Sequence, residues 1–309
     1  MRALFRTGLV VKIVLRIFAW FAGIVASLVV ALVLSVVIDA AQDGRRLQGL
    51  TNTQIGEVRV FLAKPPGDGP FPAVVMVHEF WGLRQEIVDK AKLLAKEGYV
   101  VVAPDTYRNQ RTDWIPRAIF LSASTPKDRV NQDMNEVFSW LEAQSVVDPK
   151  RIAVMGFCYG GTVALNFSLS NSRVAATAVF YGQLVTDVEI LKRLRGPLLG
   201  VFGAVDVSIP LEKVRAFEAG LLAAKVPHEV KVYDGVGHAF VQSVAEIEAG
   251  GPQGQAWAQL KAFLKRSLQN RAGSSLEPQF GPLAITAYAN PMPKDLFSML
   301  QASWLHRHH

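Results

Sequence analysis

The chain has 309 residues, half of them hydrophobic, so it can bury a sizeable core and most of it is not disordered. Its formal net charge of +7 does not indicate nucleic-acid binding, because four of the basic residues lie before residue 17 and no dense Lys/Arg stripe interleaved with aromatics follows. The single cysteine excludes an intramolecular disulfide and a metal site built from several thiolates.

The first predicted element is a membrane-spanning helix. Residues 17–38 contain no charged side chain, and this stretch is long enough to cross the hydrocarbon core of a bilayer. It is too long for the apolar region of an ordinary signal peptide, and Ile38-Asp39-Ala40-Ala41 is a poor cleavage site, so we expect an uncleaved anchor. The alternative, a buried core helix, does not explain why all sides of the helix are apolar.

The charges around this segment predict its orientation. Basic residues precede it, whereas the charges directly after it cancel one another (Asp39, Asp43, Arg45 and Arg46). The positive-inside rule therefore puts the amino terminus in the cytoplasm and the chain after residue 40 on the extracytoplasmic side. We predict a single-pass membrane protein in which residues 1–40 form a cytoplasmic stub and anchor, 41–50 a polar linker, 51–270 the folded domain and 271–309 a tail.

Beyond the linker, short β-branched runs alternate with amphipathic stretches, which predicts a mostly parallel sheet flanked by helices, an α/β fold. The predicted strands are 55–62, 73–78, 99–103, 151–155, 174–180, 198–203 and 229–233. The predicted helices are 85–97, 127–144, 160–169, 210–225 and 253–268. Several strands are nearly all apolar, as strands buried on both faces are.

The segment Gly156-Phe157-Cys158-Tyr159-Gly160-Gly161 lies between a predicted strand and a predicted helix. It matches a nucleophile elbow in which a cysteine stands at the position of the usual serine. Its glycines suit a sharp turn with a close backbone approach, and the amino terminus of the following helix favours a thiolate. The alternative is a small buried thiol beside tightly packed glycines. The flanking strand and helix favour the catalytic interpretation.

An acid and a histidine follow in the chain order that such an elbow requires. Asp206 and His238 each come after a predicted strand, where the fold places these groups. Asp206 could instead cap the next helix, and Asp234 could compete for the acid role. An oxyanion hole needs two backbone N–H groups, one after the nucleophile and one from a loop after an early strand, and Tyr159 and Phe80 are the candidates.

With these pieces in place, residues 51–268 resemble the dienelactone hydrolase family, alpha/beta hydrolases with a cysteine nucleophile. The resemblance rests on His78-Glu79-Phe80-Trp81-Gly82, Glu97-Gly98-Tyr99 with Ala103-Pro104-Asp105, Gly156-Phe157-Cys158-Tyr159-Gly160-Gly161, the loop 203–210, and Gly237-His238-Ala239-Phe240. It implies an α/β-hydrolase fold. It also gives Glu79 a supporting catalytic role, because the matching glutamate of the family helps to take the proton of the thiol when substrate binds.

The predicted substrate pocket, with Trp81, Arg108 and Gln242, departs from the family pattern. Members that act on dienelactone hold the carboxylate of the substrate with arginines, one of them at the position of Gln242. The other lies just after the Ala-Pro-Asp-x-Tyr segment, where Arg108 is one position early. Glutamine cannot replace the charge of an arginine clamp, so a carboxylated substrate is not implied.

The sequence therefore predicts a hydrolase that cleaves a carboxylic ester or lactone through a Cys-His-Asp triad and a thioester-linked acyl-enzyme. We expect a small-molecule substrate, attachment to a membrane, no nucleic-acid partner, and neither a cofactor nor a metal. Two alternatives stay open. One is acyl transfer from the same intermediate, and the other is a non-catalytic, membrane-tethered binding module.

Overall fold

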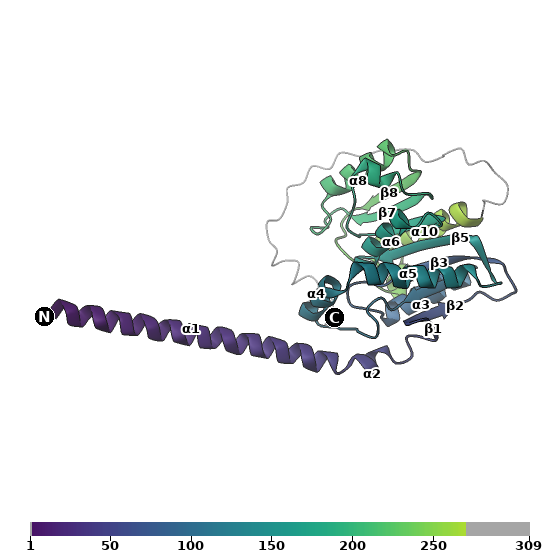
Figure 1. The fold of residues 1–309 in the computed structure, drawn as a ribbon. Helices are drawn as coiled ribbons and strands as arrows, with labels where there is room; N and C mark the ends of the chain where they lie inside the picture. The colour runs from purple at the N-terminus through teal and green to yellow at the C-terminus, as the bar shows by residue number, and fades with distance from the viewer. Residues whose placement is uncertain (1, 270–309) are drawn as a thin grey trace.

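The computed structural model describes residues 2–269, and the predicted tail, 271–309, lies outside them. One eight-stranded sheet forms the centre of the domain, with the strand order β1-β2-β4-β3-β5-β6-β7-β8 (Figure 1). The strands are β1 (Thr53–Ile55), β2 (Val58–Ala63), β3 (Phe71–Val77), β4 (Val100–Pro104), β5 (Val147–Phe157), β6 (Ala176–Phe180), β7 (Leu198–Gly203) and β8 (His228–Tyr233). All pairs from β4 to β8 are parallel, which confirms the predicted α/β-hydrolase fold.

One strand prediction was wrong. The stretch 55–62 is not a single strand, because the chain reverses at Gly56, where φ is +53°, and β1 pairs antiparallel with β2. A positive φ of this kind is readily adopted by glycine. β2 then pairs antiparallel with β4, so the hairpin extends the parallel part of the sheet at one side.

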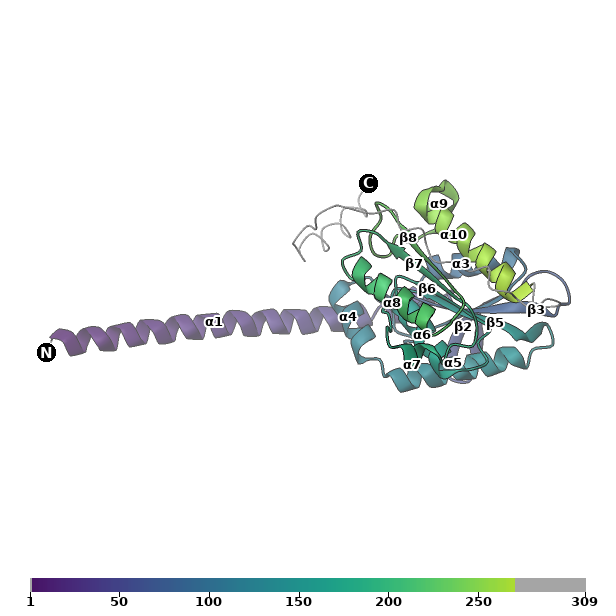
Figure 2. The same cartoon turned by 90° about the horizontal axis from the view of Figure 1, so that it is seen from above.

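Helices cover both faces of the sheet (Figure 2). The five predicted helices are present as α3 (Gln85–Lys96), α5 (Lys127–Glu142), α6 (Tyr159–Ser170), α8 (Leu211–Ala223) and α10 (Gly251–Leu264), the last continued by the π-helical turn η1 (Lys265–Gln269). Alternate residues of β3 enter different clusters: Val74 and Met76 pack with α3 and α10, whereas Val75 and Val77 pack with α5 and α6. Burial on both faces explains why the strand sequence is continuously apolar.

Four shorter helices were not predicted: α2 (Asp43–Leu47), α4 (Ile115–Ser124), α7 (Val188–Leu191) and α9 (Val244–Ala249). Three of them are too short for a helical period to be recognised in the sequence. α9 carries a complete capping box, in which Ser243 and Glu246 bind each other's backbone N–H groups. α4 is longer, but it was missed because its exposed face is apolar.

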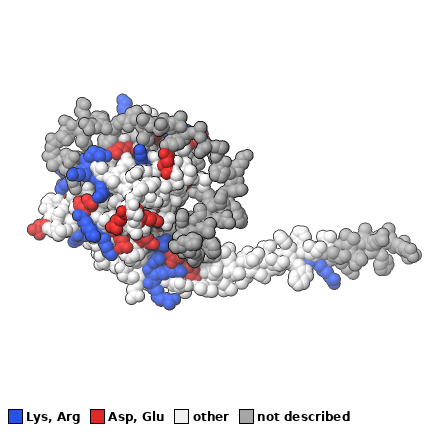
Figure 3. All heavy atoms as spheres, turned by 180° about the vertical axis from the view of Figure 1, so that it is seen from behind, with Lys and Arg blue, Asp and Glu red and all other residues white. Residues whose placement is uncertain are grey.

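The amino-terminal segment is one long helix, α1 (Arg2–Ala40), which extends away from the domain (Figures 1 and 2). Its most apolar part has a mean hydropathy of 2.9, and none of it is buried against the rest of the molecule. On the face drawn in Figure 3 the described part of the helix is almost free of charged side chains. By length and composition it could cross a membrane.

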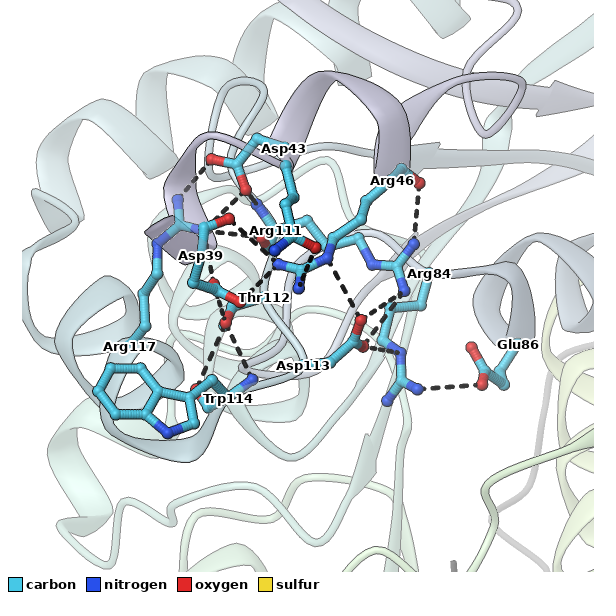
Figure 4. Close-up of polar contacts among 11 residues, drawn as sticks. Asp39, Asp43, Arg46, Arg84, Glu86, Arg111, Thr112, Asp113, Trp114 and Arg117 are labelled. Carbon is cyan, nitrogen blue, oxygen red and sulfur yellow. Dashed lines mark hydrogen bonds and ion pairs between the residues drawn. The ribbon is translucent and has the colours of Figure 1, made fainter. Parts of the chain in front are cut away.

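The predicted linker, 41–50, is packed on the domain. Its helix α2 buries Leu47, and Leu50 after it is buried in the same core cluster. Figure 4 shows the ion pairs at this junction. Arg117 of α4, only 2% exposed, donates hydrogen bonds to Asp39 at 2.9 Å and to Asp43 at 2.7 Å. The end of α1 is therefore held against the loop and helix that follow β4.

Candidate active site

Cys158 lies in a sharp turn between β5 and α6, with φ of +53° and ψ of −115°. This conformation is rare for a residue with a side chain and persists only where the surroundings enforce it. A Cβ atom on Gly156 would lie 2.2 Å from the backbone of Gly160, and one on Gly160 would lie 2.3 Å from the carbonyl oxygen of Val77. Both glycines are therefore required for the close approach of strand, turn and helix.

The structure brings Cys158, His238 and Asp206 into one hydrogen-bonded chain. Nε2 of His238 lies 3.1 Å from Sγ of Cys158, and Nδ1 lies 2.8 Å from Oδ2 of Asp206. The other oxygen of Asp206 accepts the N–H groups of Ser208 at 2.8 Å and Ile209 at 3.0 Å. The two alternatives for Asp206 are thus compatible, since one oxygen orders the turn before α8 and the other orients the imidazole.

The charge state of His238 follows from these partners. Burial alone lowers the pKa of His238, but the hydrogen bonds to Asp206 and Cys158 outweigh it and raise the pKa to about 10. With both ring nitrogens protonated, the imidazolium donates to the carboxylate and to the sulfur. The amino terminus of α6 lies at the same cysteine and favours negative charge there. The site can therefore hold a thiolate–imidazolium pair, the reactive form of a cysteine nucleophile.

Glu79 lies in the loop after β3, next to the buried side chain of His78. The side chain of Glu79 is partly exposed, yet its Oε1 atom is inaccessible and has no hydrogen-bond partner among the described residues. Burial raises the pKa of Glu79, and the charges of Lys90 and Arg84 oppose this shift. A carboxylate in such surroundings can exchange a proton closer to neutral pH than a solvated one.

Lys90 was missed by the sequence reasoning. It is fully buried on α3, and its Nζ atom lies 4.4 Å from the ring centroid of Phe157, the residue before the cysteine. Burial lowers the pKa of Lys90, while the charge of Glu79 raises it. The sequence did contain a signal, because Lys90 lies three residues after Ile87 and four before Leu94, on the buried face of the predicted helix.

His78 supports the site without being ionised. Burial lowers the pKa of His78 to about 4. Its Nε2 atom lies 3.3 Å from the backbone N of Thr106, which can only donate, so Nδ1 carries the proton and donates to the carbonyl of Glu79 at 2.6 Å. The His78 ring also stacks with Tyr159 at 5.8 Å and meets Tyr107 edge-on at 4.9 Å. The ends of β3 and β4 are thereby tied to the first residue of α6.

Tyr181 is a second residue that the sequence reasoning missed. It follows β6, is fully buried, and has φ of +40°. Its ring meets the imidazole of His238 edge-on at 5.3 Å, and its hydroxyl donates to the carbonyl of Val241 at 3.3 Å. Tyr181 therefore packs between the end of β6 and the loop of the histidine. Its position directly after a central strand was the available signal.

The two predicted oxyanion donors are Tyr159, directly after the cysteine, and Phe80, in the loop after β3. Tyr159 is the first residue of α6, and the first N–H groups of a helix have no intrahelical acceptor. Phe80 lies in the turn after β3, closed by the hydrogen bond from Gly82 N to Glu79 O at 3.2 Å. Both remain predictions for the position of an oxyanion.

The guanidinium of Arg108, one of the predicted substrate-binding residues, is already paired with two carboxylates. The guanidinium of Arg108 binds the carboxylate of Asp133 at 2.7 and 3.2 Å and also pairs with Glu57. Gln242 is exposed on the loop before α9, where its N–H donates to Glu246. Trp81 is buried, with its ring 4.4 Å from that of Phe80. Trp81 thus packs against Phe80 in the turn after β3, and the charge of Arg108 is balanced by Asp133 and Glu57. Trp81, Arg108 and Gln242 remain predictions for contact with a substrate.

Within residues 2–269, no group of three or more His, Cys, Asp or Glu side chains is placed to hold a metal ion.

Known proteins of one family are similar to this chain. The model of the family described as "Dienelactone hydrolase family" matches residues 58–268. The "Putative carboxymethylenebutenolidase" of Salmonella typhimurium is 33% identical over 215 residues, which are 64% of this chain and 79% of that protein. The crystal structure titled "Putative Dienelactone Hydrolase" from Klebsiella pneumoniae has a TM-score of 0.61 and 30% identity, covering 68% of this chain and 93% of the other.

A more distant structure has the same fold. The "Dienelactone Hydrolase-like Promiscuous Phospotriesterase P91" from metagenomic libraries has a TM-score of 0.59 and 20% identity, covering 70% of this chain and 96% of the other.

Proposed function

Because the chain belongs to the dienelactone hydrolase family, a family of lactone and ester hydrolases, we propose that it hydrolyses a carboxylic ester or lactone through Cys158, His238 and Asp206. The observation that carries this proposal is the continuous chain of short contacts from Sγ through the imidazole to a buried carboxylate. The imidazole is held in one orientation by Asp206 and can exchange a proton at the side of the sulfur.

In the first half-reaction, the Cys158 thiolate attacks the carbonyl carbon, a C–S bond forms, and an electron pair moves to the carbonyl oxygen. The N–H groups of Tyr159 and Phe80 are proposed to bind this oxyanion. When the intermediate collapses, the C–O bond breaks and the leaving oxygen takes the proton from Nε2 of His238. The product of this step is a thioester on Cys158.

In the second half-reaction, water attacks the thioester while His238 takes its proton. The C–S bond breaks, the carboxylic acid leaves, and the thiolate–imidazolium pair is restored. Glu79 is proposed to assist the transfer of the proton from the Cys158 thiol that yields the thiolate–imidazolium pair before attack. This is supported by the buried Oε1 atom and by the effect of burial, which raises the pKa of Glu79.

A covalent labelling experiment tests this mechanism. The full chain in detergent is mixed with an activated ester such as p-nitrophenyl acetate, quenched in acid, and digested for mass spectrometry. We expect one acetyl group on the peptide that contains Cys158, and none in Cys158→Ala. Turnover should fall by about four to six powers of ten in Cys158→Ala and His238→Ala, and less in Asp206→Asn. Near-normal turnover in Cys158→Ala would overturn the covalent mechanism.

We further propose that the preferred substrates are neutral. Gln242 carries no charge, and Arg108 is engaged by Asp133 and Glu57. A charge-assisted hydrogen bond contributes about 1.5–3 kcal/mol, or roughly one to two powers of ten in rate. Without a free arginine to form this bond, a carboxylate on the substrate should not increase kcat/KM.

The Gln242→Arg variant tests this preference. We expect the wild-type chain to hydrolyse a neutral ester at least as well as a matched ester that carries a carboxylate. The variant should shift the ratio of kcat/KM toward the acid by about tenfold. Asp133→Asn, which removes one of the two carboxylates that bind Arg108, is the companion variant. A strong wild-type preference for the acid that is lost in Arg108→Ala would contradict the proposal.

We propose that α1 anchors the protein in a membrane, with the amino terminus in the cytoplasm and the hydrolase domain on the extracytoplasmic side. The exposed, apolar surface of α1 supports the anchor, and the basic residues before it support the orientation. Protease accessibility of the domain in sealed spheroplasts, compared with inverted vesicles, tests the orientation. Digestion of the domain only in inverted vesicles would show that the domain lies on the cytoplasmic side.

A further inference from the structure

α4 exposes a row of apolar side chains. Four residues that recur at helical spacing are exposed: Pro116, Ile119, Phe120 and Ala123. Ile119 is 55% and Phe120 59% exposed, whereas Arg117 of the same helix is 2% exposed. A helix that buries its arginine and exposes its isoleucine and phenylalanine is inverted relative to an ordinary surface helix. The exposed face is therefore suited to an apolar environment.

α4 is fixed at the end of the apolar helix α1. Arg117 binds Asp39 in the last turn of α1 and Asp43 in α2 (Figure 4). Asp39 also accepts a hydrogen bond from Thr112, in the loop that leads into α4. Figures 1 and 2 both show α4 beside the point where α1 meets the domain. If α1 crosses a bilayer, α4 lies at the level where the chain leaves it.

The other exposed apolar side chains lie mainly at the edge that carries the active site. Outside α1, the large hydrophobic residues that are exposed in the described chain are Ile119, Phe120, Val205, Val207 and Leu222. Val205 and Val207 flank Asp206 in the loop after β7, and α4 follows the loop after β4. The carboxyl ends of these parallel strands share one edge of the sheet. Leu222, on α8, is the exception.

We infer that the exposed face of α4 lies in the surface of the bilayer that α1 crosses, and that the enzyme takes apolar, neutral esters or lactones from this bilayer. The inference rests on the membrane anchor proposed above. Apolar side chains at the headgroup boundary gain the burial that the domain itself does not provide. The edge of the sheet that holds Cys158 then faces the membrane, and a substrate dissolved in lipid reaches the thiol from that side.

Lipid photocrosslinking tests the contact. The full chain is reconstituted in phosphatidylcholine vesicles that contain a phosphatidylcholine with a diazirine in its acyl chain near the headgroup. After illumination, trypsin releases residues 118–127, which include Ile119 and Phe120, and residues 216–225, which include Leu222. The two peptides are of equal length and each contains exposed apolar side chains, so they form a matched pair.

We expect lipid adducts on α1 and on peptide 118–127, and none on peptide 216–225. Adducts on α1 alone would overturn the contact of α4 while leaving the anchor intact. No adducts on α1, with the protein failing to float with the vesicles, would overturn the anchor itself. Chemical crosslinks between residues 118–127 and residues 270–309, without lipid adducts on α4, would identify the carboxyl-terminal segment as the occupant and overturn the inference.

A pair of variants tests the consequence for substrate. In the double variant Ile119→Ser with Phe120→Ser, α4 loses apolar side chains that bind the bilayer. The ratio of domains with α4 in the bilayer surface to domains with α4 in water should fall by about tenfold or more. Turnover of an ester dissolved in the vesicles should fall accordingly, while turnover of p-nitrophenyl acetate stays unchanged. Leu222→Ser is the control and should change neither rate. Equal rates on the vesicle-borne ester in the double variant and the wild type would overturn the inferred route of the substrate.

Discussion

Two histidines at the same edge of the sheet have opposite electrostatic surroundings. His78 is fully buried beside neutral partners, and burial lowers its pKa to about 4. His238 is also buried in part, but its hydrogen bonds to Asp206 and Cys158 raise its pKa to about 10. One imidazole is therefore a neutral structural group and the other a proton carrier. Such a separation between titratable groups of one type is typical of active sites.

This difference predicts the titration of the two side chains by NMR. In protein labelled with ¹⁵N-histidine, His238 should stay protonated through neutral pH and lose its proton near pH 10, whereas His78 should stay neutral down to about pH 4. Cys158→Ala removes one of the groups that raise the pKa of His238, so its titration should move to lower pH. Titration of His238 near its ordinary value of 6.5 in the wild type would contradict the ion pair.

The same shift links His238 to stability. Because the folded protein holds the proton more tightly than the unfolded chain, this contribution is fully present below pH 6.5 and is lost as the pH rises toward about 10. Denaturant unfolding of wild type and Asp206→Asn should therefore converge at alkaline pH.

The buried charge of Lys90 acts on Glu79. Its positive charge lowers the pKa of Glu79 against the effect of burial, so Lys90→Met should make Glu79 harder to ionise. The acidic limb of the pH profile of kcat/KM should move to higher pH, and Glu79→Gln should remove this limb. Lys92→Met, on the exposed side of α3, is the control and should leave the profile unchanged. An unshifted limb in Lys90→Met would show that Glu79 does not govern the profile.

At the level of elements, the junction of α1, α2 and α4 is held by charges rather than by apolar packing alone. The side chains of Arg117 and Asp39 are only 3% and 11% exposed. Burial raises the pKa of Asp39, but its hydrogen bonds from Thr112, Arg117 and Arg46 outweigh this and lower it overall. Removing one partner of a buried pair leaves the other charge uncompensated, which is costly.

Asp39→Asn should therefore lower the free energy of unfolding by about 1–3 kcal/mol. The cost is smaller than that of removing both carboxylates, because Arg117 keeps Asp43 as a partner. Urea unfolding of the full chain in detergent measures this difference. Because the pKa of Asp39 is lowered, the stabilisation is present above pH 3.8 and is lost as the pH falls further. Asp68→Asn, on the exposed loop before β3, is the matched control. Equal stabilities of the two variants would contradict a structural role for the junction.

For the whole molecule, the arrangement predicts how the anchor can be removed. Deletion of residues 1–36 and deletion of residues 1–40 should both yield enzyme that stays in solution and hydrolyses p-nitrophenyl acetate, because none of the described side chains of α1 belongs to the hydrophobic core. The shorter deletion should have the higher melting temperature, since it alone keeps Asp39. Native mature protein found free in solution, with its amino terminus near residue 41, would contradict the anchor.

The sequence by itself determined those features whose signal is local. The positions of the six strands from β3 to β8 followed from apolar runs, and the turn at Cys158 followed from glycines spaced between a strand and a helix. The chain order of the nucleophile, Asp206 and His238 followed from the fold that these patterns indicate. The hairpin at Gly56 was missed because a single positive φ interrupts an otherwise regular pattern.

The tertiary structure alone decided the features that depend on partners far apart in the chain. Arg108 was a candidate because it lies one position before the place of a substrate-binding arginine of the family, but its guanidinium binds Asp133 of α5. Arg117 is buried and Ile119 exposed on α4 because Asp39 and Asp43 bind the arginine across more than seventy residues of sequence. Charge pairing of this kind leaves no periodicity in the sequence, since the energy of a buried ion pair depends on where the fold brings the two groups together.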